Sequence, residues 1–571
     1  MTISICLDTI LEKKNKILQF ALIDLVLSIL LIFLSNVLFL DLINHQVSTL
    51  YFWEFLNLPL QHLSFEYKLY WLLSVGITPL GLLFALTAQI KSLSAPLFGD
   101  SKWMKYNDAI KNNLFSSDGI ILGKKWGKYI RIGGFEHVIC FAPSGTGKTV
   151  SMTIPNLLTW DGSIVCTDIK LELFKKTSRF REGCGIKCFL WNPGAHDFKS
   201  HAYNPLDIVG TNKLTRVDEL HKIASILIPN KEREAPIWVN GPRNLFIALA
   251  IFVLDSDTRA KTLGEIARVV KGNEDFDRFI EEILMSDDLD PICRMNLNAY
   301  LSTPEVTRGG IKAALEASLC LFENPIIDAA TSSSCFDIRK LRQEKMTIYV
   351  GVTNDNIDRL SPLLNVFFQQ VMDVMTRKEP DETEPHGLLF LLDEFTALRR
   401  MDLFKSNIGL LRSYRVRLLI IIQDLTQLYD TYGHHGGKAF LNVKVRVALT
   451  QSSPEDAEYI SRLLGNKTVD SISKSVRGLG IRQGDMSESF SNTKRPLLLG
   501  QEIMRLSDSR NLIMIQGLNP ICANKITWYS DKNLKNRNQG AIDLPKLKIS
   551  LPTIHKKELF QENLKENEVT E

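Results

Sequence analysis

The chain has 571 residues, of which 45% are hydrophobic, 9% are aromatic and 23% are charged. This composition excludes a largely disordered protein, and the length allows about two to four domains whose cores need no disulfide or metal. The net charge of +4 is small for this length, so any basic surface must be local. The mean hydropathy of -0.01 is high for a soluble protein and indicates an uneven distribution of apolar residues.

Two long apolar stretches lie near the N-terminus. Residues 17–43 carry two charges, and residues 69–90 carry none. Each stretch can cross a hydrocarbon core of ~30 Å as a helix. The alternative for the first is a signal peptide, but residues 44–46 read Asn-His-Gln rather than a small-residue cleavage site. The alternative for the second is a buried core helix. We predict two transmembrane helices in a membrane anchor, residues 1–91.

Lysines flank the two stretches on one side only. Three lysines precede the first stretch and three follow the second, whereas the loop at 44–68 has one lysine and two glutamates. The positive-inside rule then places both termini in the cytoplasm and about 480 residues in a cytoplasmic body. The nine cysteines are scattered without a CxxC pair, which is typical of reduced thiols.

A phosphate-binding loop follows a short apolar strand predicted at 136–141. The loop has the pattern of a Walker A motif, with Ala in place of its first Gly: Ala142, Pro143, Ser144, Gly145, Thr146, Gly147, Lys148 and Thr149. The glycines let backbone N–H groups surround phosphates, the lysine neutralises the β- and γ-phosphates, and the final threonine hydroxyl ligates Mg²⁺. A helix is expected to start here, with its N-terminus toward the anion.

A second buried strand is predicted at 387–392 and ends in two acids. Asp393 is expected to hold Mg²⁺, and Glu394 to polarise the attacking water. A third strand, 416–422, ends at Gln423, which is placed to sense the γ-phosphate. The alternatives are a helix cap carrying two acids and a strand-terminal glutamine without a role. The pattern predicts an ATP and Mg²⁺ site with an α/β fold.

With these motifs the sequence resembles a known family, the coupling ATPases of type IV secretion (the VirD/TraG group). The likeness covers about residues 17–531 and includes the two N-terminal spans. Its motifs occur in the family's order, at 142–162, 163–181, 191–207, 420–433, 453–469 and 494–531.

The resemblance implies a RecA-like P-loop NTPase core with an inserted all-α domain, preceded by two transmembrane helices. The core is expected at 92–208 and 305–531, the insertion at 209–304, and a polar tail at 532–571. The insertion agrees with a helical pattern from Lys213 onward, in which apolar residues recur on one face.

The resemblance also implies a ring, usually a homo-hexamer, whose sites are completed by an arginine finger from a neighbour. Arg412, 11 residues before Gln423, is the candidate, and Arg415 and Arg417 are rivals. The patch at 307–310, which includes Arg308, also resembles the family, but we derive no role for it from the sequence.

The expected function is a multi-pass ATPase of the bacterial inner membrane that delivers substrate to type IV secretion channel components. The substrate is expected to be a relaxase–ssDNA complex, protein effectors, or both. A cargo receptor with little motor activity is the alternative. A septal chromosome translocase is a third, which would have four spans and a long linker. A basic, Gly/Ser-rich loop at 471–496 could contact a phosphate backbone or be a solvated surface loop.

Overall fold

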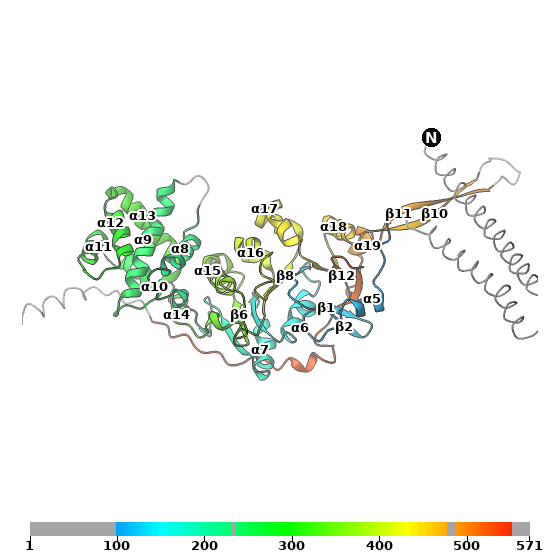
Figure 1. Cartoon of the computed structure of the whole chain (residues 1–571), viewed down its shortest axis with the longest axis horizontal. Coiled ribbons are helices and arrows are strands. Elements are labelled where there is room, and N and C mark those ends of the chain that lie inside the picture. Colours follow the sequence, from blue (N-terminus) through cyan, green and yellow to red (C-terminus); the bar gives the residue numbers. More distant parts are fainter. Residues whose placement is uncertain (1–98, 231–234, 274, 477–485, 551–571) are drawn as a thin grey trace, which may run out of the picture. The chain divides into compact units, whose positions relative to one another are not determined.

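The computed structural model describes residues 99–230, 235–273, 275–476 and 486–550 (Figure 1). The predicted anchor and both of its spans lie outside these residues. The chain divides into two compact units, Met1–Asp100 with Lys467–Lys494, and Ser101–Asn466 with Arg495–Glu571. The second unit contains the predicted nucleotide site.

The second unit is organised around an eleven-stranded sheet with the order β2-β1-β13-β12-β9-β3-β8-β7-β4-β6-β5. The strands are β1 (Ile120–Lys125), β2 (Lys128–Ile132), β3 (Val138–Phe141), β4 (Ser163–Asp168), β5 (Lys187–Trp191), β6 (Met346–Gly351), β7 (Leu388–Leu392), β8 (Val416–Ile422), β9 (Val445–Ala448), β12 (Arg510–Ile515) and β13 (Ile521–Asn524).

Seven of these strands, from β9 to β5, run parallel, and β12, β13, β1 and β2 extend the sheet with antiparallel pairs. This mixed sheet confirms the predicted α/β fold, and it fits a RecA-like core. β3, β7 and β8 lie where the sequence predicts strands. They are almost entirely apolar because both faces of the sheet are covered.

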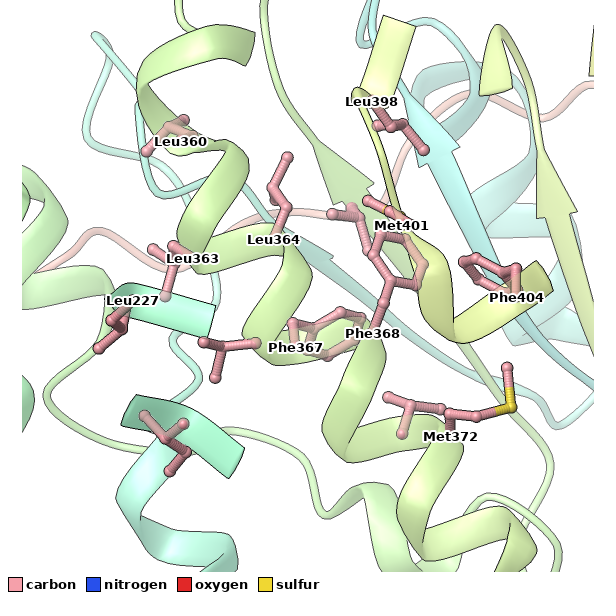
Figure 2. Close-up of a cluster of buried hydrophobic side chains, with 14 of the residues drawn as sticks. Leu227, Leu360, Leu363, Leu364, Phe367, Phe368, Met372, Leu398, Met401 and Phe404 are labelled. Atoms are coloured by element: carbon pink, nitrogen blue, oxygen red, sulfur yellow. The ribbon is translucent and has the colours of Figure 1, made fainter. Parts of the chain in front are cut away.

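Two hydrophobic cores cover the two faces of the sheet. Alternate residues of each parallel strand point into one core or the other, as Ile139 and Cys140 of β3 do. On one face, α15 (Ile357–Thr376) presents an apolar stripe to its neighbours (Figure 2). Phe368 of α15 packs against Phe404 with ring centroids 5.9 Å apart. This packing fixes the segment that follows β7, where the predicted acids lie.

A helical region interrupts the sheet between β5 and β6. α9 lies at its centre and contacts α8, α10, α12 and α13. Among the described residues, α9 alone is long and apolar enough to span a membrane, but more than half of its apolar window is buried in the protein. The helical region continues past residue 304, where the expected insertion ends, because α13 also packs on α9. The helices are α8 (Arg216–Leu227), α9 (Pro236–Asp255), α10 (Leu263–Gly272), α11 (Phe276–Leu284), α12 (Pro291–Leu301), α13 (Glu305–Leu319) and α14 (Pro325–Ala330).

Two C-terminal segments differ from the sequence-based expectation. The described parts of the loop expected at 471–496 belong to a two-stranded sheet, β10 (Asn466–Val476) with β11 (Met486–Pro496). β10 contains several β-branched residues, which suit a strand, but β11 has only one, and the low apolar content of both is typical of a loop. The segment after residue 532, expected to be a polar tail, begins against the core. Leu534 is fully buried, and Leu547 N–H donates to the Phe198 carbonyl.

Candidate active site

The glycine-rich loop joins β3 to a helical segment, η3 (Thr149–Thr153) followed by α6 (Ile154–Leu157). Gly145 and Gly147 have φ of 79° and 78°, which a residue with a Cβ adopts only with strain. No atom lies within 4 Å of a Cβ built on either glycine, so this side of the loop is open. The loop therefore has the geometry of a phosphate cradle.

Ala142, which replaces the usual first glycine, fits its position without strain. It is fully buried, and its N–H donates to the Ile422 carbonyl of β8 at 2.9 Å. Its φ is not in the left-handed region, where a glycine would be required. The departure from the Walker A pattern thus leaves the loop intact.

The acid after β7 meets the loop because β7, β8 and β3 are neighbouring parallel strands that end at one edge of the sheet. Asp393 Oδ2 accepts hydrogen bonds of 3.3 Å from the hydroxyls of Thr149 and Thr153. Thr167 of β4 donates to the Asp393 carbonyl at 2.9 Å. Two of these contacts, from Thr153 and Thr167, are not apparent from the Walker patterns.

The Asp393 carboxylate is suited to a cation. Its side chain is buried, and its Oδ1 has no hydrogen-bond partner in the described part of the chain. Burial raises the pKa of Asp393, and the Lys148 cation opposes that shift. A buried carboxylate with a free oxygen, next to a threonine hydroxyl, supplies the hard oxygen ligands that Mg²⁺ prefers. The donor set therefore fits Mg²⁺ at Thr149 and Asp393.

Lys148 and Glu394 form an ion pair across the site. Lys148 Nζ lies 2.9 Å from Glu394 Oε1, although the two groups are not aligned as a hydrogen bond. Glu394 has φ of 54°, a left-handed conformation that is uncommon for a non-glycine residue. Such backbone conformations persist where surrounding packing enforces them and are enriched at active sites.

Gln423 lies at the same edge of the sheet, directly after β8. Its Oε1 accepts a hydrogen bond of 3.1 Å from the Ser144 hydroxyl in the loop. A movement of the loop would therefore reach β8 through this contact. The geometry brings Gln423 together with the loop but does not test its role as a sensor.

Arg412 lies at the opposite edge of the sheet. It precedes β8 and forms an ion pair of 2.9 Å with Glu136, which precedes β3. Its side chain is 55% exposed. Arg417 is buried and donates to the carbonyls of Ile132 and Glu136. Arg415 donates to the Glu384 carbonyl. Of the three arginines, Arg412 is thus the one whose contacts are to a side chain rather than to backbone carbonyls.

Two further residues lie near the loop, Asp168 from the family-like segment 163–181 and Lys525, to which the sequence assigns no role. Asp168, at the end of β4, accepts N–H bonds of 2.9 Å from Glu172 and Phe174, and burial raises its pKa to about 6. Lys525 donates to the Thr146 carbonyl at 2.8 Å. A small cavity lined by Thr149, Asp168, Asp393 and Glu394 lies between these elements. No local pattern predicts Lys525, because it lies 379 positions from Thr146.

The 307–310 patch has a structural role in the helical region. Arg308 donates to Asp277 Oδ2 and to the carbonyls of Leu301 and Thr303, each at 2.9 Å. Arg308 therefore holds the C-terminal end of α12 to α11. A Cβ on Gly310 would meet the Trp238 ring, so this glycine allows α9 and α13 to approach.

Residues 94–550 match the family described as Type IV secretory system Conjugative DNA transfer. Protein VirD4 from Rhizobium radiobacter is 31% identical over 446 residues, covering 76% of this chain and 63% of that protein. VirD4 from Agrobacterium fabrum is 30% identical over 434 residues, covering 76% and 64%. The chain thus spans less than two thirds of the length of these VirD4 relatives. Conjugal transfer protein TraG from Escherichia coli is 24% identical, covering 76% and 75%.

Solved structures with a similar fold include the plasmid coupling protein TrwB. Its complex with the ATP analogue ADPNP gives a TM-score of 0.56 at 14% identity, covering 81% of this chain and 99% of that one. Its complex with ADP and Mg²⁺ gives 0.54 at 15% identity, covering 75% and 94%. At these identities the similarity concerns the fold.

Proposed function

The chain belongs to the type IV secretory system conjugative DNA transfer family, and we propose that it is a membrane-anchored coupling ATPase. It recruits a relaxase–ssDNA complex, protein effectors, or both, and delivers them to a type IV secretion channel. The observation that carries this proposal is the convergence of Lys148, Thr149, Asp393 and Glu394 at one edge of the sheet.

In this proposal each side chain has a separate task. Lys148 binds the β- and γ-phosphates, while the backbone N–H groups of the loop orient them. Thr149 and Asp393 hold Mg²⁺, which neutralises charge on the phosphate oxygens when bound. Glu394 orients and polarises the attacking water. The reported complexes of TrwB with ADP and Mg²⁺ and with ADPNP support ATP and Mg²⁺ as the ligands.

The proposal also assigns two residues to communication. Gln423 couples the state of the phosphates to β8, because it contacts the loop through Ser144. Arg412 acts on the site of a neighbouring subunit in a homo-hexamer. Its ion pair with Glu136 places it at the sheet edge away from its own loop, which supports action between subunits rather than within one.

The anchor completes the proposal. Two transmembrane helices at 17–43 and 69–90 would hold the protein in the bacterial inner membrane as a multi-pass protein, with both termini in the cytoplasm. The distribution of lysines around these stretches supports this orientation.

The decisive variant is Lys148→Ala. It should remain in the membrane but lose ATP turnover and substrate transfer, because the phosphates lose their main cationic contact. Lys213→Ala, an exposed lysine in the helical region, is the matched control. If Lys148→Ala still supports transfer, the motor assignment fails and a cargo receptor is favoured. Cargo captured by Glu394→Gln in membranes would identify the substrate class.

A further inference from the structure

An exposed cluster of aromatic and basic side chains lies at the start of the second unit. The rings of Tyr106, Phe115 and Trp126 have centroids 5.6 to 6.0 Å apart. They come from α5 (Tyr106–Lys111), the turn after it, and the β1–β2 turn. We call the cluster the aromatic–lysine patch and define it as Tyr106, Ile110, Phe115 and Trp126 with Lys105, Lys111, Lys125 and Lys128.

The patch is strongly basic. Residues 101–131 contain six lysines and one arginine against two aspartates, a net charge of +5, whereas the whole chain carries +4. Lys124 pairs with Asp531, but the four lysines of the patch form no ion pair with any residue that the structure describes. The patch is therefore a locally basic surface whose lysines remain available to an anionic partner.

The patch also exposes apolar surface beside the charge. Ile110 is 51% exposed, Tyr106 38% and Trp126 36%. Tryptophan and tyrosine with lysines on long stems are the side chains favoured at the membrane–water interface, where rings sit at headgroup level and ammonium groups reach the phosphates. We propose that the aromatic–lysine patch docks on the anionic phospholipid surface of the membrane.

Nucleic acid is a weaker match for this patch, because a lysine lies over each of its three rings. Lys128 Nζ lies over the rings of Tyr106 and Phe115 at 5.7 and 5.3 Å from their centroids. Lys125 Nζ lies 4.9 Å from the centroid of the Trp126 ring. Single-stranded nucleic acid is held by bases that stack on open aromatic faces. A lipid headgroup needs no open face, only exposed ring edges and cations.

Chain length favours the same partner. The inference rests on the anchor of the proposed function, whose second span is expected to end at residue 90. Eleven residues then reach Ser101, a length of at most ~40 Å when fully extended. The patch begins within a few residues of Ser101, so its local concentration at the membrane surface would be high.

The test uses the full-length chain in lipid nanodiscs, with the photo-crosslinker p-benzoylphenylalanine replacing Trp126. The nanodiscs contain phosphatidylcholine alone or an equimolar mixture with phosphatidylglycerol. Lipid adducts at position 126 should be abundant with phosphatidylglycerol and several-fold fewer without it. Trp238 in the helical region, 38% exposed, is the matched control position and should give few adducts in either case.

Charge reversal provides the second measurement. Lys105→Glu with Lys111→Glu should lower the adduct yield at position 126 by roughly tenfold or more. Lys213→Glu with Lys261→Glu, also exposed, changes the net charge equally and should have no effect. Adduct yields equal to those at Trp238, or adducts with added single-stranded DNA in place of lipid, overturn the inference. Lys148→Ala should keep the lipid adducts, so failure of the ATPase assignment is recognised separately.

Discussion

Lys148 Nζ lies 2.9 Å from Glu394 Oε1, so the cation of the P-loop contacts the carboxylate assigned to water activation. The two side chains are 9% and 20% exposed, and the contact is therefore only weakly screened by solvent. The proposed function needs the same ammonium group for the phosphates. If Lys148 binds the phosphates as proposed, nucleotide and Glu394 would compete for it, and release of the carboxylate would be coupled to nucleotide binding.

This coupling predicts two opposite effects of Glu394→Gln. ATP turnover should fall by about 100-fold or more, because water activation is lost. Nucleotide affinity should rise, because the neutral amide no longer competes for Lys148. Turnover assays and binding of a fluorescent ATP analogue measure the two effects. Glu382→Gln, at an exposed position before β7, is the control. Normal turnover of Glu394→Gln would remove its assigned role.

Much of this site could be predicted from the sequence, because its signals are local. β3, β7 and β8 are short apolar runs with polar residues at their C-terminal ends, and parallel pairing brings such ends to one edge. Walker A residues are fixed by the phosphate chemistry and occur consecutively. Strand order alone then places Asp393 and Gln423 beside the loop.

The remaining features depend on contacts between distant residues. Lys525 reaches Thr146 only because β13 is part of the same sheet, and no pattern near Lys525 indicates this. β10 and β11 are rich in Ser, Thr and Asn, so they do not show the apolar alternation of a half-buried strand. Arg308 belongs to a patch that resembles the family, but its contacts with α11 and α12 could be assigned only from the structure.

Arg412 is predicted to act between subunits. Arg412→Ala should lower turnover by about a thousandfold, the size of effect expected for an arginine finger. Mixing Arg412→Ala with Lys148→Ala subunits should restore part of the activity, because some interfaces then pair an intact loop with an intact arginine. Arg415→Ala mixed in the same way is the control. If Arg415→Ala shows this complementation and Arg412→Ala does not, the assignment moves to Arg415.

The hydrogen bonds of buried His137 beside the sheet are predicted to be sensitive to acid. Its Nδ1 accepts from Leu418 N–H at 3.1 Å, and its Nε2 lies 2.8 Å from the Ile408 carbonyl. Burial lowers its pKa from 6.5 to about 4. The unfolded state takes up the proton near pH 6.5 and the folded state near pH 4. Stability from neutral His137 is therefore complete above pH 6.5 and is lost as the pH falls toward 4, by at most ~3 kcal/mol.

Hydrogen exchange at the Leu418 amide measures this loss locally. After correction for the intrinsic pH dependence, protection of Leu418 should decrease between pH 6.5 and 4. His137→Asn, which keeps an acceptor near the position of Nδ1 but does not titrate there, should show a flatter profile. The Leu190 amide on β5 donates to His201 Nδ1, and burial also lowers the pKa of His201. Exchange protection of the Leu190 amide therefore provides an internal comparison. An unchanged Leu418 profile would contradict the assignment.

Lys525 is predicted to set the conformation of the P-loop. Its ammonium group binds the Thr146 carbonyl, and a carbonyl held in this way cannot turn toward the phosphates. Burial lowers the pKa of Lys525, so the contact places a partly desolvated cation beside the loop. Lys525→Met, which keeps the length of the side chain, should weaken nucleotide binding by about tenfold, the usual effect of losing one hydrogen bond to a charged group. Lys532→Met, at an exposed position, should bind nucleotide normally. Equal dissociation constants for the two variants would show that the loop keeps its conformation without Lys525.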